Sequence, residues 1–294
     1  MSKDDDTEET GEEICVRALR SILKGQLNDI NKLLVLISAI QKNEAIYTNV
    51  DRQVLKIVLT MTHMVGVSGE TIKLLTEGKK LQIRDAFPIA RSITEMTVNI
   101  CYIMAVGKDI ARQAENHAEQ KSYNNLQINK KMGDFSYEIH WSGELRSSDE
   151  VRLKSITQDF RSKKGREKNW TDLSISDRII EIEKTFPKTS INLACAMIII
   201  YPNASEIVHG SYYGAMHFWQ PELPNGTPNS VEELRQLVVT HQLTVLCTVV
   251  QSYFSLIDCY GAFLNVEELT NVSATRFDQF KQLIEGLNEM QLEA

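Results

Sequence analysis

The chain has 294 residues, of which 43% are hydrophobic and 24% charged, an ordinary composition for one large globular domain or two smaller ones. It contains only six Pro and fourteen Gly. So few breakers disfavour sandwiches and barrels, which need frequent turns, and favour long helices. The net charge of −7 says little about partners, because most of the negative excess lies in residues 1–13.

The acidic N-terminus predicts a disordered tail over residues 1–11 that merges into the first helix. Its acids are opposed by Lys3 alone: Asp4, Asp5, Asp6, Glu8, Glu9, Glu12 and Glu13. Carboxylates suit the positive end of a helix dipole, and a charged stretch without apolar residues cannot form a core. An acidic arm that binds a partner is the alternative interpretation.

Five cysteines, at positions 15, 101, 195, 247 and 259, lie mostly in apolar segments. The odd number and the absence of Cys-x-x-Cys argue against a disulfide framework or a zinc site, so we expect buried thiols in a reducing compartment. The start of the chain lacks the basic and apolar segments of a signal peptide. No window holds eighteen uncharged apolar residues, so we expect no helix that spans a bilayer. We therefore expect a cytoplasmic protein without membrane contact.

Apolar residues recur at helical spacing through the first part of the chain and predict four helices, over residues 12–42, 51–77, 81–106 and 108–131. Asp51 is a good N-cap for the second helix, and Gly78 and Gly107 can end the second and third. The third helix is apolar on nearly all sides and should be buried. The fourth is polar and should lie outside.

The pattern weakens in the middle of the chain, so we expect an insertion or lid near residues 132–173, with a charged helix near 147–162. A basic stretch at 161–168 contains five cations and would suit a nucleic-acid patch. An exposed loop is the favoured interpretation, because no companion basic stripe occurs elsewhere.

Order returns with a capped helix over 174–186, followed by a second apolar core helix over 189–201 that should contact the third helix. Pro202 fits the first turn of a short helix that ends at His209. A Gly/Pro-rich loop covers 211–229. Two more helices follow, at 230–265 and about 275–290. Together these features predict an all-α bundle of eight to nine helices, without a sheet, in one domain over 12–290.

Three polar residues share one face of the apolar third helix. Arg91 and Glu95 are four residues apart, and Asn99 continues the same stripe. Charges in such a helix are expensive to bury unless they are paired or hydrogen-bonded. The stripe is therefore either an internal ion pair that fixes the helix register or the wall of a polar pocket.

A second polar group, also spaced by four, follows the helix at 189–201. It consists of Tyr201, Ser205 and His209. Histidine can act as a general base near neutral pH, serine or tyrosine as a donor or nucleophile, and Glu206 could orient His209. A capping histidine at a helix end is the alternative. We expect Arg91, Glu95 and His209 to form one polar cluster, because Glu95 alone cannot satisfy a guanidinium with five donors.

Three short motifs resemble an uncharacterised family of helical microbial proteins, a domain of unknown function, over about residues 50–260. They are Arg-Ser-Ile-Thr-Glu at 91–95, Trp-Ser-Gly at 141–143 and Tyr-x3-Ser-x3-His-Gly at 201–210. The arrangement is also distantly similar to the HEPN bundles (higher eukaryotes and prokaryotes nucleotide-binding). Many HEPN proteins are dimeric ribonucleases of toxin and antiviral systems with an Arg-x4–6-His motif. This chain departs from that motif, because the positions open to the arginine hold Pro202, Asn203 and Ala204.

The HEPN resemblance implies an effector or accessory protein of a microbial antiviral defence system that acts on RNA or a nucleotide. Arg91 would bind phosphate and His209 would be the acid/base. Glu95 would join them in catalysis, and Tyr201, Ser205 and Asn99 would bind or position the substrate.

Two alternatives stay open. One is a non-catalytic helical module for ligand binding or protein interaction, and the other is a hydrolase of another substrate. The sequence has no Gly-rich phosphate loop and no metal-ligand spacing, so it predicts no cofactor and no metal. We expect a homo-oligomer or a partner protein, because the first helix and the long helix at 230–265 offer more apolar area than one bundle covers.

Overall fold

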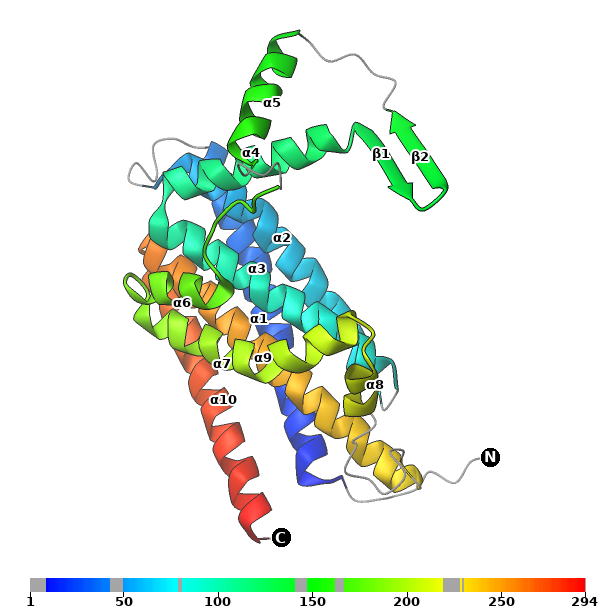
Figure 1. Ribbon diagram of the computed structural model, residues 1–294. Helices are drawn as coiled ribbons and strands as arrows, with labels where there is room; N and C mark the ends of the chain where they lie inside the picture. The colour runs from blue at the N-terminus through cyan, green and yellow to red at the C-terminus, as the bar shows by residue number, and fades with distance from the viewer. Residues whose placement is uncertain are drawn as a thin grey trace.

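The computed structural model describes residues 9–42, 50–78, 81–140, 147–161, 167–218, 228 and 230–293. Within these residues the chain forms ten α-helices, one 3-10 helix and a two-stranded sheet (Figure 1). The helices are α1 (Gly11–Lys42), α2 (Arg52–Leu75), α3 (Ala86–Val106), α4 (Lys108–Asn124), α5 (Ser147–Asp159), α6 (Ile175–Glu183), α7 (Pro187–Val208), α8 (Tyr212–Phe218), α9 (Val231–Leu264) and α10 (Glu267–Glu293). The predicted helical class is confirmed, whereas the helix count of eight to nine was too low.

The prediction of no sheet was wrong. Strands β1 (Gln127–Met132) and β2 (Phe135–His140) form an antiparallel hairpin, and α4 ends well before the predicted boundary at 131. The two strands are joined at Gly133, whose φ of 61° suits glycine. Each strand is only six residues long, so the alternation of polar and apolar residues is too short to stand out from the helical pattern before it.

Helix α9 is the centre of the core. It packs against α1, α3, α7 and α10, and it is buried on almost all sides from Leu237 to Leu264. Helix α3 is buried as predicted, and it contacts α7 as predicted. Helix α7 is not a core helix, because only its inner side is buried while Ile191 and Ile198 are 63% and 76% exposed.

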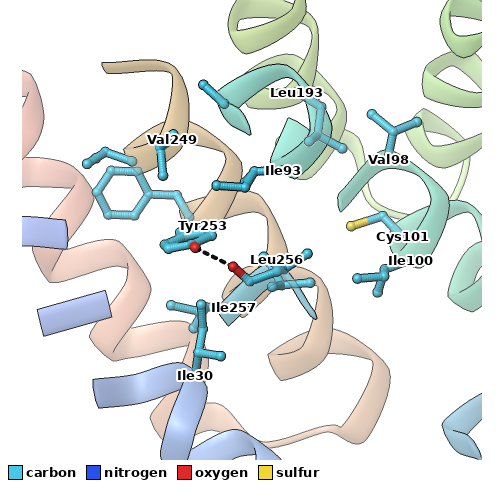
Figure 2. Packing of buried hydrophobic residues seen from close by; sticks show 14 of the residues in the cluster. Ile30, Ile93, Val98, Ile100, Cys101, Leu193, Val249, Tyr253, Leu256 and Ile257 are labelled. Atoms are coloured by element: carbon cyan, nitrogen blue, oxygen red, sulfur yellow. Dashed lines mark hydrogen bonds between the residues drawn. The ribbon is translucent and has the colours of Figure 1, made fainter. Parts of the chain in front are cut away.

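Polar side chains fix the position of α9 against its neighbours. The Tyr253 hydroxyl donates to the Val65 carbonyl at 2.7 Å, and the Tyr260 and Thr62 hydroxyls lie 2.7 Å apart. Figure 2 shows Tyr253 enclosed by aliphatic side chains from several helices. Apolar contacts alone are not directional, so these hydrogen bonds select one register of α9 against α2.

Helix α7 runs from Pro187 through Pro202 to Val208 without a break. The short separate helix predicted from Pro202 onward is therefore wrong. Pro202 lacks the N–H that would bond to the Ile198 carbonyl, but its exposed position lets the helix continue with little rearrangement of the core. Within the described residues, α7 and α9 are long and apolar enough to span a membrane, a property that core helices share.

The domain boundaries stay a prediction. Residues 1–8 of the acidic tail, the Trp-Ser-Gly at 141–143 and most of the basic stretch lie outside the described residues. The predicted insertion or lid contains the hairpin and α5, which Figure 1 places at one end of the bundle.

Gly69 on α2 leaves room for Tyr253. A Cβ at Gly69 would lie 1.9 Å from the Tyr253 hydroxyl oxygen and 2.8 Å from Leu27. We expect Gly69→Ala to lower the free energy of unfolding by about 1–3 kcal/mol, because the core must shift to accept the methyl group. Urea unfolding measures this change.

Gly66→Ala is the matched control on the same helix, since its nearest neighbour would lie at 3.5 Å. We expect it to be neutral or stabilising by up to about 1 kcal/mol through helix propensity. Equal destabilisation by both variants would contradict the steric argument.

Candidate functional site

The predicted charged stripe on α3 forms a paired cluster at the junction with α7. The Arg91 Nε donates to Glu95 Oε1 at 2.7 Å, and the two side chains are 18% and 32% exposed. The Arg91 guanidinium also lies 4.2 Å from the centre of the Tyr201 ring. The structure thus brings together Arg91, Glu95 and Tyr201, and the charge of Arg91 is compensated within the chain.

Arg178 on α6 extends this cluster. It donates from Nη1 to Asn99 Oδ1, and from Nε and Nη2 to the Leu173 carbonyl at 3.1 and 3.0 Å. Its guanidinium lies 5.3 Å from the ring centre of Trp170. Burial lowers the pKa of Arg178, and the nearby Tyr102 and Glu95 groups act in the opposite direction. Five side chains, Tyr201, Arg91, Glu95, Arg178 and Asn99, therefore form a continuous polar seam.

Sequence reasoning missed Arg178, because an arginine on a short amphipathic helix looks like a solvated charge. The capping box of Ser174 and Asp177 fixes the start of α6 and so positions Arg178 against α3. That capping signal was visible in the sequence, whereas the contact between α6 and α3 was not.

The structure does not bring His209 to the seam. His209 is the exposed C-cap of α7, and its side chain makes no hydrogen bond or ion pair with the described residues. It lies eight residues beyond Tyr201, which corresponds to about 12 Å along a helix. Ser205 lies between them and is half-buried. Glu206 accepts a hydrogen bond from Ser211 Oγ at 2.6 Å and does not bond to His209.

A cavity of about 660 Å³ opens beside the Asn99 end of the seam. It lies between α2, α3, α4 and α5, with Trp170 in its lining, and most of its wall is apolar: Ile57, Met61, Ile103, Ala114, Ala118, Leu126 and Leu153. A volume of this size and a largely apolar wall are typical of small-molecule sites. No motif in the sequence pointed to it, because its lining comes from segments far apart in the chain.

Three residues of the cavity lining carry hydrogen-bond donors that have no partner within the described residues. Arg178 occupies Asn99 Oδ1, so the Asn99 amide group has its two N–H donors left over. The Tyr123 hydroxyl and the Trp170 indole N–H also have no hydrogen-bond partner within the described ranges.

Two ion pairs stand at the rim of the cavity. Lys56 Nζ lies 2.6 Å from Glu115 Oε1, and Arg152 pairs with Glu119. The hydrogen bond from Lys56 lowers the pKa of Glu115, and Glu115 in turn raises the pKa of Lys56. Because cations and acids balance, the rim offers no net charge to a ligand.

The side chains of two histidines meet at the end of α8. The ring centres of His217 and His241 lie 6.2 Å apart, and Phe87 packs against both rings edge-on. Phe87 is one turn before Arg91 on α3. The polar seam is thus bounded on this side by an aromatic cluster.

Comparison with known proteins identifies one family. Residues 57–227, more than half of the chain, match a family of unknown function, DUF5677. The chain belongs to this family. No curated protein and no solved structure matches the chain. The DUF5677 match contains the whole seam and the whole cavity lining except Lys56. The predicted membership of an uncharacterised family is confirmed, and the HEPN likeness stays a prediction.

A double-mutant cycle tests whether Arg91 and Glu95 stabilise each other. We expect Arg91→Ala to cost about 1–2 kcal/mol of unfolding free energy, less than a fully buried pair, because both side chains are partly exposed. The double variant with Glu95→Ala should cost less than the sum of the single variants, by roughly 0.5–1 kcal/mol. Strict additivity in denaturant unfolding would show that the contact is not a coupled pair.

Proposed function

We propose that this DUF5677 protein is a ligand-binding helical module whose site is the cavity between α2, α3, α4 and α5. One observation carries the proposal, namely a cavity of about 660 Å³ whose wall is mostly apolar and includes a few residues with unpaired donors. Apolar walls provide binding energy through burial, and a small number of fixed polar groups provides orientation.

The lining also defines the chemistry of the ligand. The donors are Asn99, Tyr123 and Trp170, so the ligand needs a hydrogen-bond acceptor such as a carbonyl group. The paired rim charges give no attraction for an ion. The ligand is therefore a small, largely apolar and uncharged molecule with an acceptor, and Trp170 offers a face on which a planar ring can stack.

Arg178 gives Asn99 its role in this proposal. An isolated asparagine amide can turn to present either its oxygen or its nitrogen. The hydrogen bond from Arg178 holds the Asn99 side-chain oxygen, so the Asn99 side-chain nitrogen is left for the ligand. At this point the site therefore binds only groups that accept a hydrogen bond.

Nile red, a neutral dye with a carbonyl group and environment-dependent fluorescence, probes the cavity directly. We expect wild-type protein to bind it and Ala118→Trp to abolish binding by filling the cavity. Ala262→Trp on the exposed side of α9 is the matched control and should bind the dye normally. Absence of binding by the wild type, or equal binding by both tryptophan variants, would rule out the cavity as the site.

Asn99→Asp tests the donor in the same assay. The substitution keeps the shape and the contact with Arg178 but removes the N–H donors, so we expect the dissociation constant for Nile red to rise roughly tenfold, which corresponds to about 1.4 kcal/mol. Unchanged affinity would leave the apolar cavity in place but remove Asn99 from recognition.

The effector role in antiviral defence, with ribonuclease activity at Arg91 and His209, stays a second proposal. The observation in its favour is that Tyr201, beside Arg91, and His209 reach solvent along the same helix. Phosphate would have to displace Glu95 from Arg91, and His209 would have to act about 12 Å further along α7.

His209→Ala separates the two functions. Under the ribonuclease proposal it abolishes cleavage of a fluorescent RNA oligonucleotide and leaves the melting temperature within a few degrees, because His209 is exposed. Under the ligand-binding proposal it leaves the dissociation constant for Nile red unchanged. RNA cleavage by the wild type that persists in this variant would contradict the assignment of His209.

A further inference from the structure

The outer face of α7 is apolar and uncovered by any described element. Helix α7 packs with its inner side on α3 and α9, and its ends meet α6 and α8. The outer side carries Ile191, Cys195, Ile198 and Pro202, all exposed. The sequence prediction of an oligomer rested on the first helix and the long helix at 230–265, but the apolar sides of both are buried inside the chain. The uncovered apolar surface is on α7 instead.

The spacing of these residues is that of a helix–helix seam. Ile191, Cys195, Ile198 and Pro202 alternate steps of four and three residues, the pattern by which one helix packs along another. No Asp, Glu, Lys or Arg occurs between Lys188 and Glu206, so the surface holds no charge that a close partner would leave buried and unpaired. The face therefore fits an apolar helix.

The charged residues at the two ends of this face indicate which apolar helix packs on it. Lys188 and Glu206 are eighteen residues apart, which is five turns of 3.6 residues, so they lie on the same edge of the stripe. In an antiparallel pair related by a twofold axis, the same edge of each helix meets its own copy. Lys188 of one protomer then lies beside Glu206 of its partner, and the reverse pair forms at the other end.

Both side chains can reach such a partner. Lys188 is held only by a long contact of 3.9 Å to Asp258 and is 56% exposed. Glu206 uses Oε2 for Ser211, and its other carboxylate oxygen has no partner within the described ranges. A membrane surface would favour a rim of cations, whereas this edge has one cation and one acid.

We propose that α7 is the interface with a second copy of the same chain, paired antiparallel about a twofold axis near Ile198. Ile198 lies close to the midpoint between Lys188 and Glu206 and is 76% exposed. Tyr212 and Tyr213 of the neighbouring α8 are also exposed. This interface goes beyond the ligand-binding function and does not depend on it.

Sedimentation of the full chain across a micromolar dilution series tests the interface. The wild type should show a reversible dimer, and Ile198→Asp should be monomeric at every concentration, because it places two carboxylates at the axis. Val35→Asp on α1 is the matched control, since Val35 is as exposed as Ile198 but lies on another helix. It should dimerise like the wild type.

A monomeric wild type, or a dimer that survives Ile198→Asp, would overturn the proposal. So would a monomer that floats with vesicles of phosphatidylcholine and phosphatidylglycerol through the same residue. Circular dichroism of each variant confirms that the helices are intact.

Crosslinking tests the orientation. Cys195 is the one cysteine of the five that is exposed. In the antiparallel pair the two copies of Cys195 are offset by at least about 6 Å along the axes, too far for a disulfide, whereas a thiol at the axis meets its copy. We expect Ile198→Cys in a Cys195→Ser background to form a disulfide dimer under mild oxidation, and the wild type and Cys195→Ser to form none. Crosslinking of the wild type through Cys195 would indicate a parallel pair and overturn the proposed geometry.

Discussion

The fold depends on hydrogen bonds to the polar groups of α9, a helix that has almost no access to water. Between Arg235 and Asp258, α9 carries no Asp, Glu, Lys or Arg, and most of its buried hydroxyl and amide groups bond inside the core. Ser252 meets Thr94 of α3 at 2.9 Å, and the Val250 carbonyl accepts from Gln26 of α1 at 3.0 Å. With the tyrosine contacts to α2, these bonds hold three helices in one arrangement around α9.

That arrangement creates both the seam and the cavity. Helices α2 and α3 pack directly against each other, and the cavity lies over this pair, where α4 and α5 cover it only in part. The attachment of α3 to α9 sets the rotation of α3, which directs Arg91, Glu95 and Asn99 away from α9 and towards α6 and α7. The position of the polar seam is thus a consequence of the hydrogen bonds that fix α3 against α9 in the core.

Local sequence patterns predicted the features of the structure that depend on residues close together in the chain. The spacing of Arg91 and Glu95 placed them on one face and left an ion pair as one of two interpretations, and the helical periods predicted most of the helices. Patterns did not predict which apolar helix lies in the centre, because α7 and α9 both lack charged residues over long stretches. An apolar run shows that a helix must be buried against other elements, but tertiary packing decides which elements these are. Here α9 is surrounded by other helices of the chain, whereas α7 is buried on one side only.

The joint site of Arg91 and His209 was predicted from the energetic cost of a buried charge. That premise is sound, but the argument considered only hydrogen-bonding groups as partners of Arg91. A guanidinium in a buried helix does need further partners besides a single carboxylate. The structure meets that need with the face of Tyr201, and α6 supplies Arg178 as a second cation near Glu95. A π-face is a partner that hydrogen-bond counting omits, and once it is included the exposed His209 is not needed to satisfy Arg91. The seam therefore explains the charges on α3 without catalysis.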